Sequence, residues 1–87
     1  MEVKLNLKLD SQTDKVLSHI ERYDGITSME AFEKYRITRL SAKIFELRKR
    51  GVKVITDMQD GKDGQYAVYR LQDGQTILRL YPRRRVG

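Results

Sequence analysis

The chain has 87 residues, of which 39% are hydrophobic, and it contains no cysteine. This length allows one domain, and the hydrophobic share excludes a disordered chain. Without cysteine there are no disulfides and no thiolate metal sites, which suits a reducing cytoplasm, and the absence of a long hydrophobic run excludes a membrane span.

The net charge of +6 is distributed unevenly along the chain. Residues 1–35 hold five Lys or Arg against seven Asp or Glu, a balance of −2. Residues 36–87 hold thirteen against five, a balance of +8. A basic half of this kind favours a polyanionic partner.

Residues 1–9 are predicted to form a half-buried strand, because apolar and polar residues alternate from Val3 to Leu9. This alternation is unlike a signal peptide. Ser11 to Asp14 resemble a helix capping box in which Asp replaces Glu or Gln. A helix is therefore expected over residues 12–23. Its inner side is expected to hold Val16, Leu17, Ile20 and Tyr23.

A second, shorter helix is expected after the Asp24-Gly25 stop signal. Ile26 and Thr27 are compatible with a short strand. Thr27 or Ser28 is expected to cap the helix, with Glu30 in its first turn. The apolar residues of this helix are Met29, Ala31, Phe32 and Tyr35.

A third helix is expected after a turn at residues 36–37, with Thr38 as its cap. Apolar residues recur along it at i, i+4 and i+7, a pattern typical of a helix that faces a core. This buried stripe is expected to consist of Leu40, Ile44 and Leu47. Phe45 and Tyr35 are also expected in the core rather than in base stacking.

The segment after Gly51 is predicted to form a β-hairpin, because residues 52–58 and 66–71 favour strands. Residues 59–65 hold two glycines and two aspartates and are expected to form its loop. The remaining segments are a turn (72–75), a strand (76–81) and an arginine-rich tail (83–85). The first and last strands are expected to pair with each other or with a second subunit.

Taken together, these elements predict an α+β fold, a winged helix-turn-helix with three helices, a C-terminal β-hairpin wing and an added N-terminal strand. Residues 1–87 are expected to form a single domain. Its parts are the N-terminal strand (1–9), the three-helix unit (10–51), the wing (52–71) and the C-terminal strand with its basic tail (72–87).

The exposed side of the third helix is rich in long hydrogen-bond donors, as a helix in the DNA major groove requires. Arg39 is placed to donate two parallel hydrogen bonds to guanine, and Ala42 to approach a thymine methyl group. Lys49 and Arg50, further along, suit backbone phosphates. The residues expected to contact DNA are Thr38, Arg39, Ser41, Ala42, Lys43, Lys49, Arg50, Lys53, Lys62 and Arg70.

Several of these assignments have alternatives. The whole basic side of the helix is also compatible with a solvated surface, and Ser41 with an inward position. Glu46 is expected either to accept a hydrogen bond from cytosine or to pair with Lys43 or Lys49. Lys62, at the hairpin tip, has an aspartate on each side, which weakens the local positive field. The arginine-rich tail suits either phosphate binding or solubility.

Residues 25–57, GITSMEAFEKYRITRLSAKIFELRKRGVKVITD, together with residues 66–71, YAVYRL, resemble the winged helix-turn-helix proteins of phages and prophages. They resemble bacterial winged-helix repressors more loosely. This resemblance covers about half of the chain and implies DNA binding. It implies base reading by Thr38, Arg39, Ala42 and Lys43, and a wing over residues 52–71. The chain departs from many such proteins at Arg36, where a glycine is common in the turn.

Enzymatic chemistry is not indicated. His19 is the single histidine, and the residues around it have neither metal-ligand spacing nor the pattern of a catalytic triad. The chain has no Walker or dinucleotide glycine motif. We therefore expect no enzymatic activity, no cofactor and no metal, with His19 at the surface or its boundary.

The sequence thus predicts sequence-specific double-stranded DNA binding by a small phage or mobile-element protein, in transcriptional regulation or as a recombination accessory factor. A homodimer is expected, since two half-sites multiply specificity. One alternative is a winged helix that binds a host or phage protein as an inhibitor or adaptor. Another is a single-strand or RNA binder in which Tyr66, Tyr69 and Tyr81 stack on bases.

Overall fold

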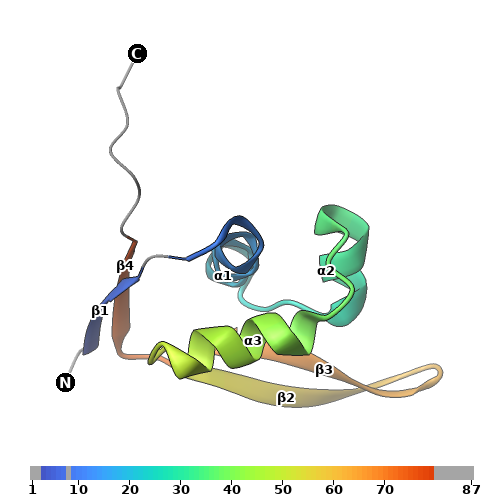
Figure 1. Ribbon diagram of the computed structural model, residues 1–87. Helices are drawn as coiled ribbons and strands as arrows, with labels where there is room; N and C mark the ends of the chain where they lie inside the picture. The colour runs from blue at the N-terminus through green and yellow to red at the C-terminus, as the bar shows by residue number, and fades with distance from the viewer. Residues whose placement is uncertain (1–2, 8, 80–87) are drawn as a thin grey trace.

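The computed structural model describes residues 3–7 and 9–79. Three helices precede an antiparallel hairpin, and the first and last strands of the described residues pair with each other (Figure 1). The elements are β1 (Val3–Leu7), α1 (Ser11–Tyr23), α2 (Ser28–Tyr35), α3 (Leu40–Lys49), β2 (Val54–Gly61), β3 (Gly64–Leu71) and β4 (Gln75–Arg79). This arrangement confirms the predicted winged helix-turn-helix architecture with an added N-terminal strand.

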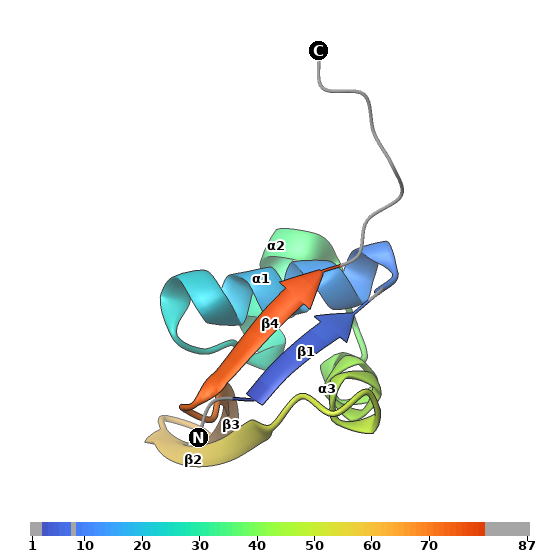
Figure 2. The same cartoon turned by 90° about the vertical axis from the view of Figure 1, so that its left-hand side faces the viewer.

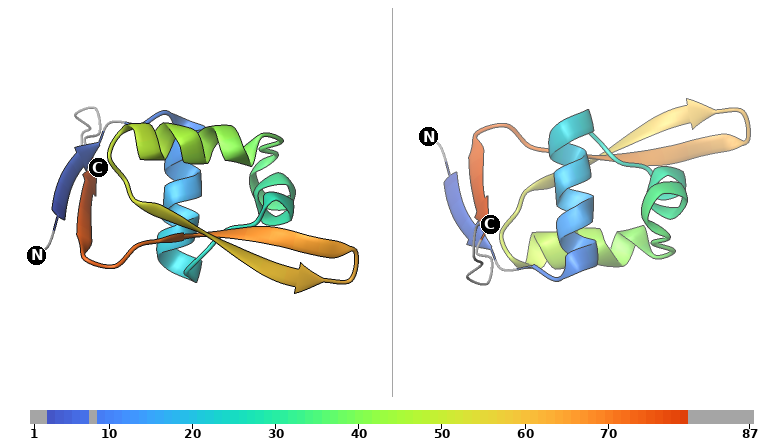
Figure 3. Two further views of the ribbon diagram at one scale, coloured as in Figure 1. Left: turned by 90° about the horizontal axis from the view of Figure 1, so that it is seen from below. Right: turned by 90° about the horizontal axis from the view of Figure 1, so that it is seen from above.

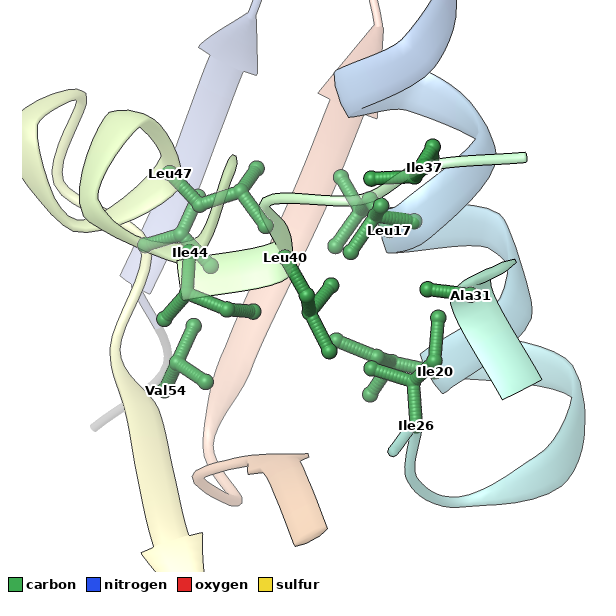
Figure 4. Packing of buried hydrophobic residues seen from close by; sticks show 11 residues of the cluster. Leu17, Ile20, Ile26, Ala31, Ile37, Leu40, Ile44, Leu47 and Val54 are labelled. Atoms are coloured by element: carbon green, nitrogen blue, oxygen red, sulfur yellow. The ribbon is translucent and has the colours of Figure 1, made fainter. Parts of the chain in front are cut away.

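The hydrophobic core lies between the three helices and the start of the hairpin (Figure 4). The predicted stripe of α3 is part of it, since Leu40, Ile44 and Leu47 expose 2% or less of their surface. Burying a side chain of this size contributes about 1.5–3 kcal/mol, so the stripe holds one side of α3 inward. The rest of the core cluster consists of Val16, Leu17, Ile20, Ile26, Ala31, Ile37, Val52 and Val54.

Two apolar residues predicted to face inward lie at the surface instead. Tyr23 exposes 58% of its surface and Phe45 exposes 65%. Tyr23 is the last residue of α1, and its ring packs on the ring of His19 at a centroid distance of 4.6 Å. Phe45 follows Ile44 by one residue, and the turn of about 100° per residue carries it away from the buried stripe. Tyr35, by contrast, packs against the core as expected.

A side-chain cap lies at the N-terminus of each of the first two helices. Asp10 caps α1 by accepting a hydrogen bond of 2.7 Å from the Thr13 N–H, so the predicted capping box starting at Ser11 is wrong. α2 begins with a reciprocal capping box between Thr27 and Glu30, in which each side chain accepts from the other's N–H at 3.1 Å. This capping box confirms the prediction that Thr27 or Ser28 caps α2 with Glu30 in its first turn. The sequence could predict it because both partners lie within one turn.

The turn between α2 and α3 depends on Arg36, which adopts a left-handed conformation with φ of 59°. Its N–H donates to the Phe32 carbonyl at 2.9 Å, and its guanidinium carbon lies 5.4 Å from the centre of the Phe32 ring. The cation–π contact offsets part of the strain that a side chain incurs at positive φ. α3 then starts at Leu40 with Arg39 as its N-cap, so the prediction of Thr38 as the cap is wrong.

β2 and β3 form a longer hairpin than predicted. Their pairing extends to Gly61 opposite Gly64, which leaves only Lys62 and Asp63 as the tip. The predicted loop over residues 59–65 is therefore mostly strand. Ile26 pairs with Tyr69 through two backbone hydrogen bonds of 2.9 and 3.0 Å. This is an isolated bridge to β3 rather than the short strand considered for Ile26 and Thr27.

β1 and β4 pair in parallel within the same chain, from Val3 opposite Gln75 to Leu7 opposite Arg79 (Figure 2). The Gln75 side chain anchors this end of the molecule. Its amide accepts from the Lys53 N–H at 3.1 Å and donates to the Lys53 carbonyl at 2.8 Å. The predicted arginine-rich tail, residues 83–85, lies outside the described residues.

Candidate nucleic-acid interface

α3 and the hairpin lie on one face of the molecule, and α1 crosses behind them (Figure 3). Because the buried stripe of α3 points inward, the opposite side of this helix is open to solvent. Ala42, Phe45 and Lys49 recur there at i, i+3 and i+7, and all three are exposed. An exposed helix of this kind has the width that the DNA major groove admits.

A shallow depression of about 240 Å³ lies at the N-terminal end of α3. It is lined by Gln12, Arg36, Ile37, Thr38, Arg39, Ala42 and Lys43. The tight turn at Arg36 brings the end of α2 next to the start of α3, and α1 contributes one side. The four residues that the resemblance associates with base reading, Thr38, Arg39, Ala42 and Lys43, thus line one concave surface.

Among the described residues, Arg39, the N-cap of α3, and Lys49, its last residue, are exposed cations whose side chains are unpaired. Within residues 3–7 and 9–79, neither side chain forms an ion pair or a hydrogen bond. Arg39 stands at the beginning of the helix and Lys49 at its end, about 15 Å apart at 1.5 Å per residue. Two unpaired cations at this spacing provide donors at both ends of the exposed side.

Lys43 is more enclosed than expected. Its side chain is 23% exposed, and Nζ lies 3.9 Å from Oδ2 of Asp10, the cap of α1. Hydrogen bonds from Thr13, and next the positive charge of Lys43, hold the pKa of Asp10 below its ordinary value of 3.8. Asp10 therefore carries a negative charge near neutral pH and reduces the field of Lys43 on the surface.

The basic run at the end of α3 divides into three different roles. Arg48 donates to the Val54 carbonyl at 2.8 Å and to the Thr56 hydroxyl at 2.9 Å, which joins α3 to β2. Arg50 pairs with Glu46 at 2.9 Å, one helical turn earlier. The expected pairing of Glu46 with Lys43 or Lys49 is therefore wrong. Among the described residues, only Lys49 of this run has an unpaired side chain.

The predicted wing residues also divide. Lys53 and Lys62 are exposed, at the start and at the tip of the hairpin. Arg70 is half-buried and donates to two groups of the chain, the Asp57 carboxylate at 3.1 Å and the Asp24 carbonyl at 2.7 Å. Ser41 is exposed, so its alternative inward position is wrong. Arg70 thus differs from the other two cations in being committed to partners within the chain.

His19 is a buried core residue, which corrects the expectation of a surface or boundary position. It exposes 2% of its surface, and its Nδ1 shares a hydrogen bond of 2.9 Å with the Tyr35 hydroxyl. Its Nε2 lies 3.6 Å from a carboxylate oxygen of Glu30. These partners come from α2, a helix separated from α1 by a loop, so no local pattern around His19 revealed them.

The described residues form neither a metal-binding cluster nor a membrane-spanning helix. No group of three or more His, Asp or Glu side chains in residues 3–7 and 9–79 is arranged to hold a metal ion. None of the described helices combines the length and the apolar character that a membrane crossing requires. Nothing in the same residues points to catalysis.

Comparison with protein families assigns this chain to a known group. The family described as "Winged helix-turn-helix domain" matches residues 11–74, from the start of α1 to the turn before β4. Comparison with curated proteins and with solved structures produced no significant match. Because the matched segment spans well over half of the chain, this protein belongs to the winged helix-turn-helix domain family, whose fold indicates DNA binding in general.

Proposed function

We propose that this protein binds double-stranded DNA sequence-specifically, with α3 in the major groove and the hairpin along the adjacent backbone. The observation that carries this proposal is the exposed side of α3, where Arg39 and Lys49 are unpaired among the described residues. A surface cation without a partner is well placed to displace counterions from phosphate or to donate to base edges.

Each end of α3 has its own part in this proposal. Arg39 enters the groove first and donates to guanine, with Thr38, Ser41 and Ala42 close to the bases. Lys43 contributes less to base contact than Arg39 does, because Asp10 lies 3.9 Å from its ammonium group. Lys49 neutralises a backbone phosphate at the far end of the helix, and Arg50 does so only after it exchanges Glu46 for phosphate.

The hairpin supplies a second set of phosphate contacts. Lys53 and Lys62 are both exposed, and Arg48 holds β2 against α3 through the Val54 carbonyl. A fixed angle between helix and hairpin lets both elements meet the duplex together. Arg70 is assigned to the fold rather than to DNA, because three groups of this chain already receive its hydrogen bonds and charge.

The biological setting proposed for this activity is a phage or mobile element, with a role in transcriptional regulation or as a recombination accessory factor in the cytoplasm. The protein acts as a homodimer, since one helix reads only a few base pairs and two half-sites multiply specificity. A host or phage protein that binds the same face would compete with DNA.

Selection from a random duplex pool tests the proposal. The chain is mixed with the pool and an excess of non-specific competitor DNA, and bound fragments are recovered and sequenced. We expect one enriched motif, bound with an affinity that falls steeply as salt rises. A palindromic motif supports the dimer, with half-sites one helical turn or a multiple of it apart.

The control is the same chain with Arg39→Ala and Lys49→Ala combined, which should lose the enrichment without losing the fold. Equal recovery of unrelated duplexes, or tighter binding to single-stranded DNA or RNA than to any duplex, would overturn sequence-specific duplex binding. Recovery of a partner protein with no measurable duplex affinity would favour the protein-binding alternative instead.

A further inference from the structure

A large aromatic side chain lies on the side of α3 that the proposed function directs toward DNA. Phe45 exposes 65% of its surface. It stands one turn after Ala42 and one turn before Lys49, on the same exposed side of the helix. Its ring therefore belongs to the surface that would enter the groove, between Arg39 and Lys49, the two cations that are unpaired among the described residues.

The fold itself gives Phe45 no buried position. The neighbouring residues Ile44 and Leu47 fill the core with 1% and 0% exposure. Arg48, which follows Phe45 by three residues, is directed to β2 by its hydrogen bonds to Val54 and Thr56. Phe45 thus presents apolar surface to solvent in the free protein. Contact with an apolar group of a binding partner would remove this surface from water and favour binding.

Among the four bases, thymine alone presents an apolar group in the major groove, the methyl group at C5. A phenyl ring offers no hydrogen bond to the polar edges of guanine, cytosine or adenine. We infer that Phe45 is a specificity-determining residue that reads thymine through its 5-methyl group, with Ala42 alongside it. This inference rests on the proposed duplex binding and adds the base that the middle of α3 recognises.

The test replaces thymine by uracil, which removes the methyl group and leaves the hydrogen-bonding edge unchanged. Each thymine of the duplex motif recovered by selection is replaced singly, and the dissociation constant is measured by fluorescence anisotropy at one fixed salt concentration. For the unmodified protein, we expect one or two positions at which uracil weakens binding about fourfold, the effect of one buried methyl group.

Protein variants then assign this effect to Phe45. In Phe45→Ala most of the preference for thymine over uracil should disappear, because the ring that covers the methyl group is gone and only the smaller contact of Ala42 remains. Phe45→Leu keeps an apolar side chain and should retain most of the preference for thymine. The matched control is Tyr23→Ala, which removes an aromatic residue that is 58% exposed on α1, and it should keep the full preference. Thermal unfolding of each variant establishes that it is folded.

The outcomes separate this inference from the proposed function. Duplex binding with no sensitivity to uracil at any position, or a thymine preference of undiminished size in Phe45→Ala, overturns the role of Phe45 and leaves duplex binding intact. A recovered motif without thymine does the same. Failure of the unmodified protein to bind any duplex overturns the proposed function and this inference together.

Discussion

Arg70 of β3 donates a hydrogen bond of 2.7 Å to the backbone carbonyl of Asp24, 46 positions earlier in the chain. The same guanidinium donates to the Asp57 carboxylate at 3.1 Å and lies 3.5 Å from the carboxylate of Asp24. Asp24 itself ends α1 in a left-handed conformation with φ of 65°. One side chain thus ties the hairpin to the loop between α1 and α2.

Replacement of Arg70 by alanine should lower the free energy of unfolding by about 1–2 kcal/mol, because the hydrogen bonds to Asp24 and Asp57 are lost. Urea unfolding measures this change. The slope of log affinity for DNA against log salt should stay as it is, since Arg70 neutralises no phosphate in the proposed complex. Lys53→Ala is the matched control and should show the reverse pattern. A reduced salt slope in Arg70→Ala, with unchanged stability, would contradict the structural role.

Arg39 and Lys49 should differ in the kind of loss that their replacement causes. Arg39→Ala should weaken the selected duplex by about 1–3 kcal/mol and relax the base preference at one position. Lys49→Ala should weaken all duplexes about equally and reduce the salt slope by about 1, because a phosphate contact carries no sequence information. Anisotropy titrations over several duplexes and salt concentrations measure both. Lys34→Ala, on the exposed surface of α2, is the control; a loss of equal size there would contradict the assignment to α3.

Asp10 makes the stability of the protein depend on pH in the acidic range. Its pKa is held below 3.8, chiefly by the hydrogen bonds from Thr13, and returns to 3.8 when the chain unfolds. The stabilisation is therefore complete above pH 3.8 and is lost as the pH falls through the lower pKa of the folded state. Asp10→Asn keeps a good cap but does not titrate, so its stability should fall less than that of the unmodified protein between pH 5 and pH 2.

Thermal unfolding over this pH range checks the role of Asp10. Asp10→Ala removes the cap altogether and should cost about 1 kcal/mol at neutral pH. Asp73→Asn, at an exposed aspartate in the turn before β4, is the matched control and should follow the unmodified protein. If Asp10→Asn and the unmodified protein lose stability in parallel, the hydrogen bond from Thr13 does not hold the carboxylate in solution.

The left-handed Arg36 predicts an unusual order among substitutions. Arg36→Gly should be more stable than Arg36→Ala by about 1 kcal/mol, because glycine adopts positive φ without steric strain. At Lys15, an exposed residue in the second turn of α1, the order should reverse by a similar amount, since glycine is the poorer helix former there. Urea unfolding of the four variants measures both differences. The same order at both positions would show that Arg36 is not left-handed in solution.

Short-range patterns predicted much of the fold. The recurrence of Leu40, Ile44 and Leu47 predicted the buried side of α3, and Thr27 with Glu30 predicted the start of α2. Both depend on residues within two helical turns of each other, where helix geometry alone determines which side chains lie on the same face. Phe45 shows the limit of such patterns, because it borders the stripe and yet exposes 65% of its surface.

Helix faces, turn positions and the basic second half of the chain follow from the order of amino acids, since backbone periodicity and local capping need no distant partner. The tertiary structure, by contrast, decided which cations remain available on the surface. Arg48 and Arg70 are occupied by Thr56 and Asp24, whereas Arg39 and Lys49 are unpaired among the described residues. The physical reason is that Arg70 contacts a group 46 positions earlier only after the chain has folded. A short-range sequence pattern cannot predict a contact across that separation.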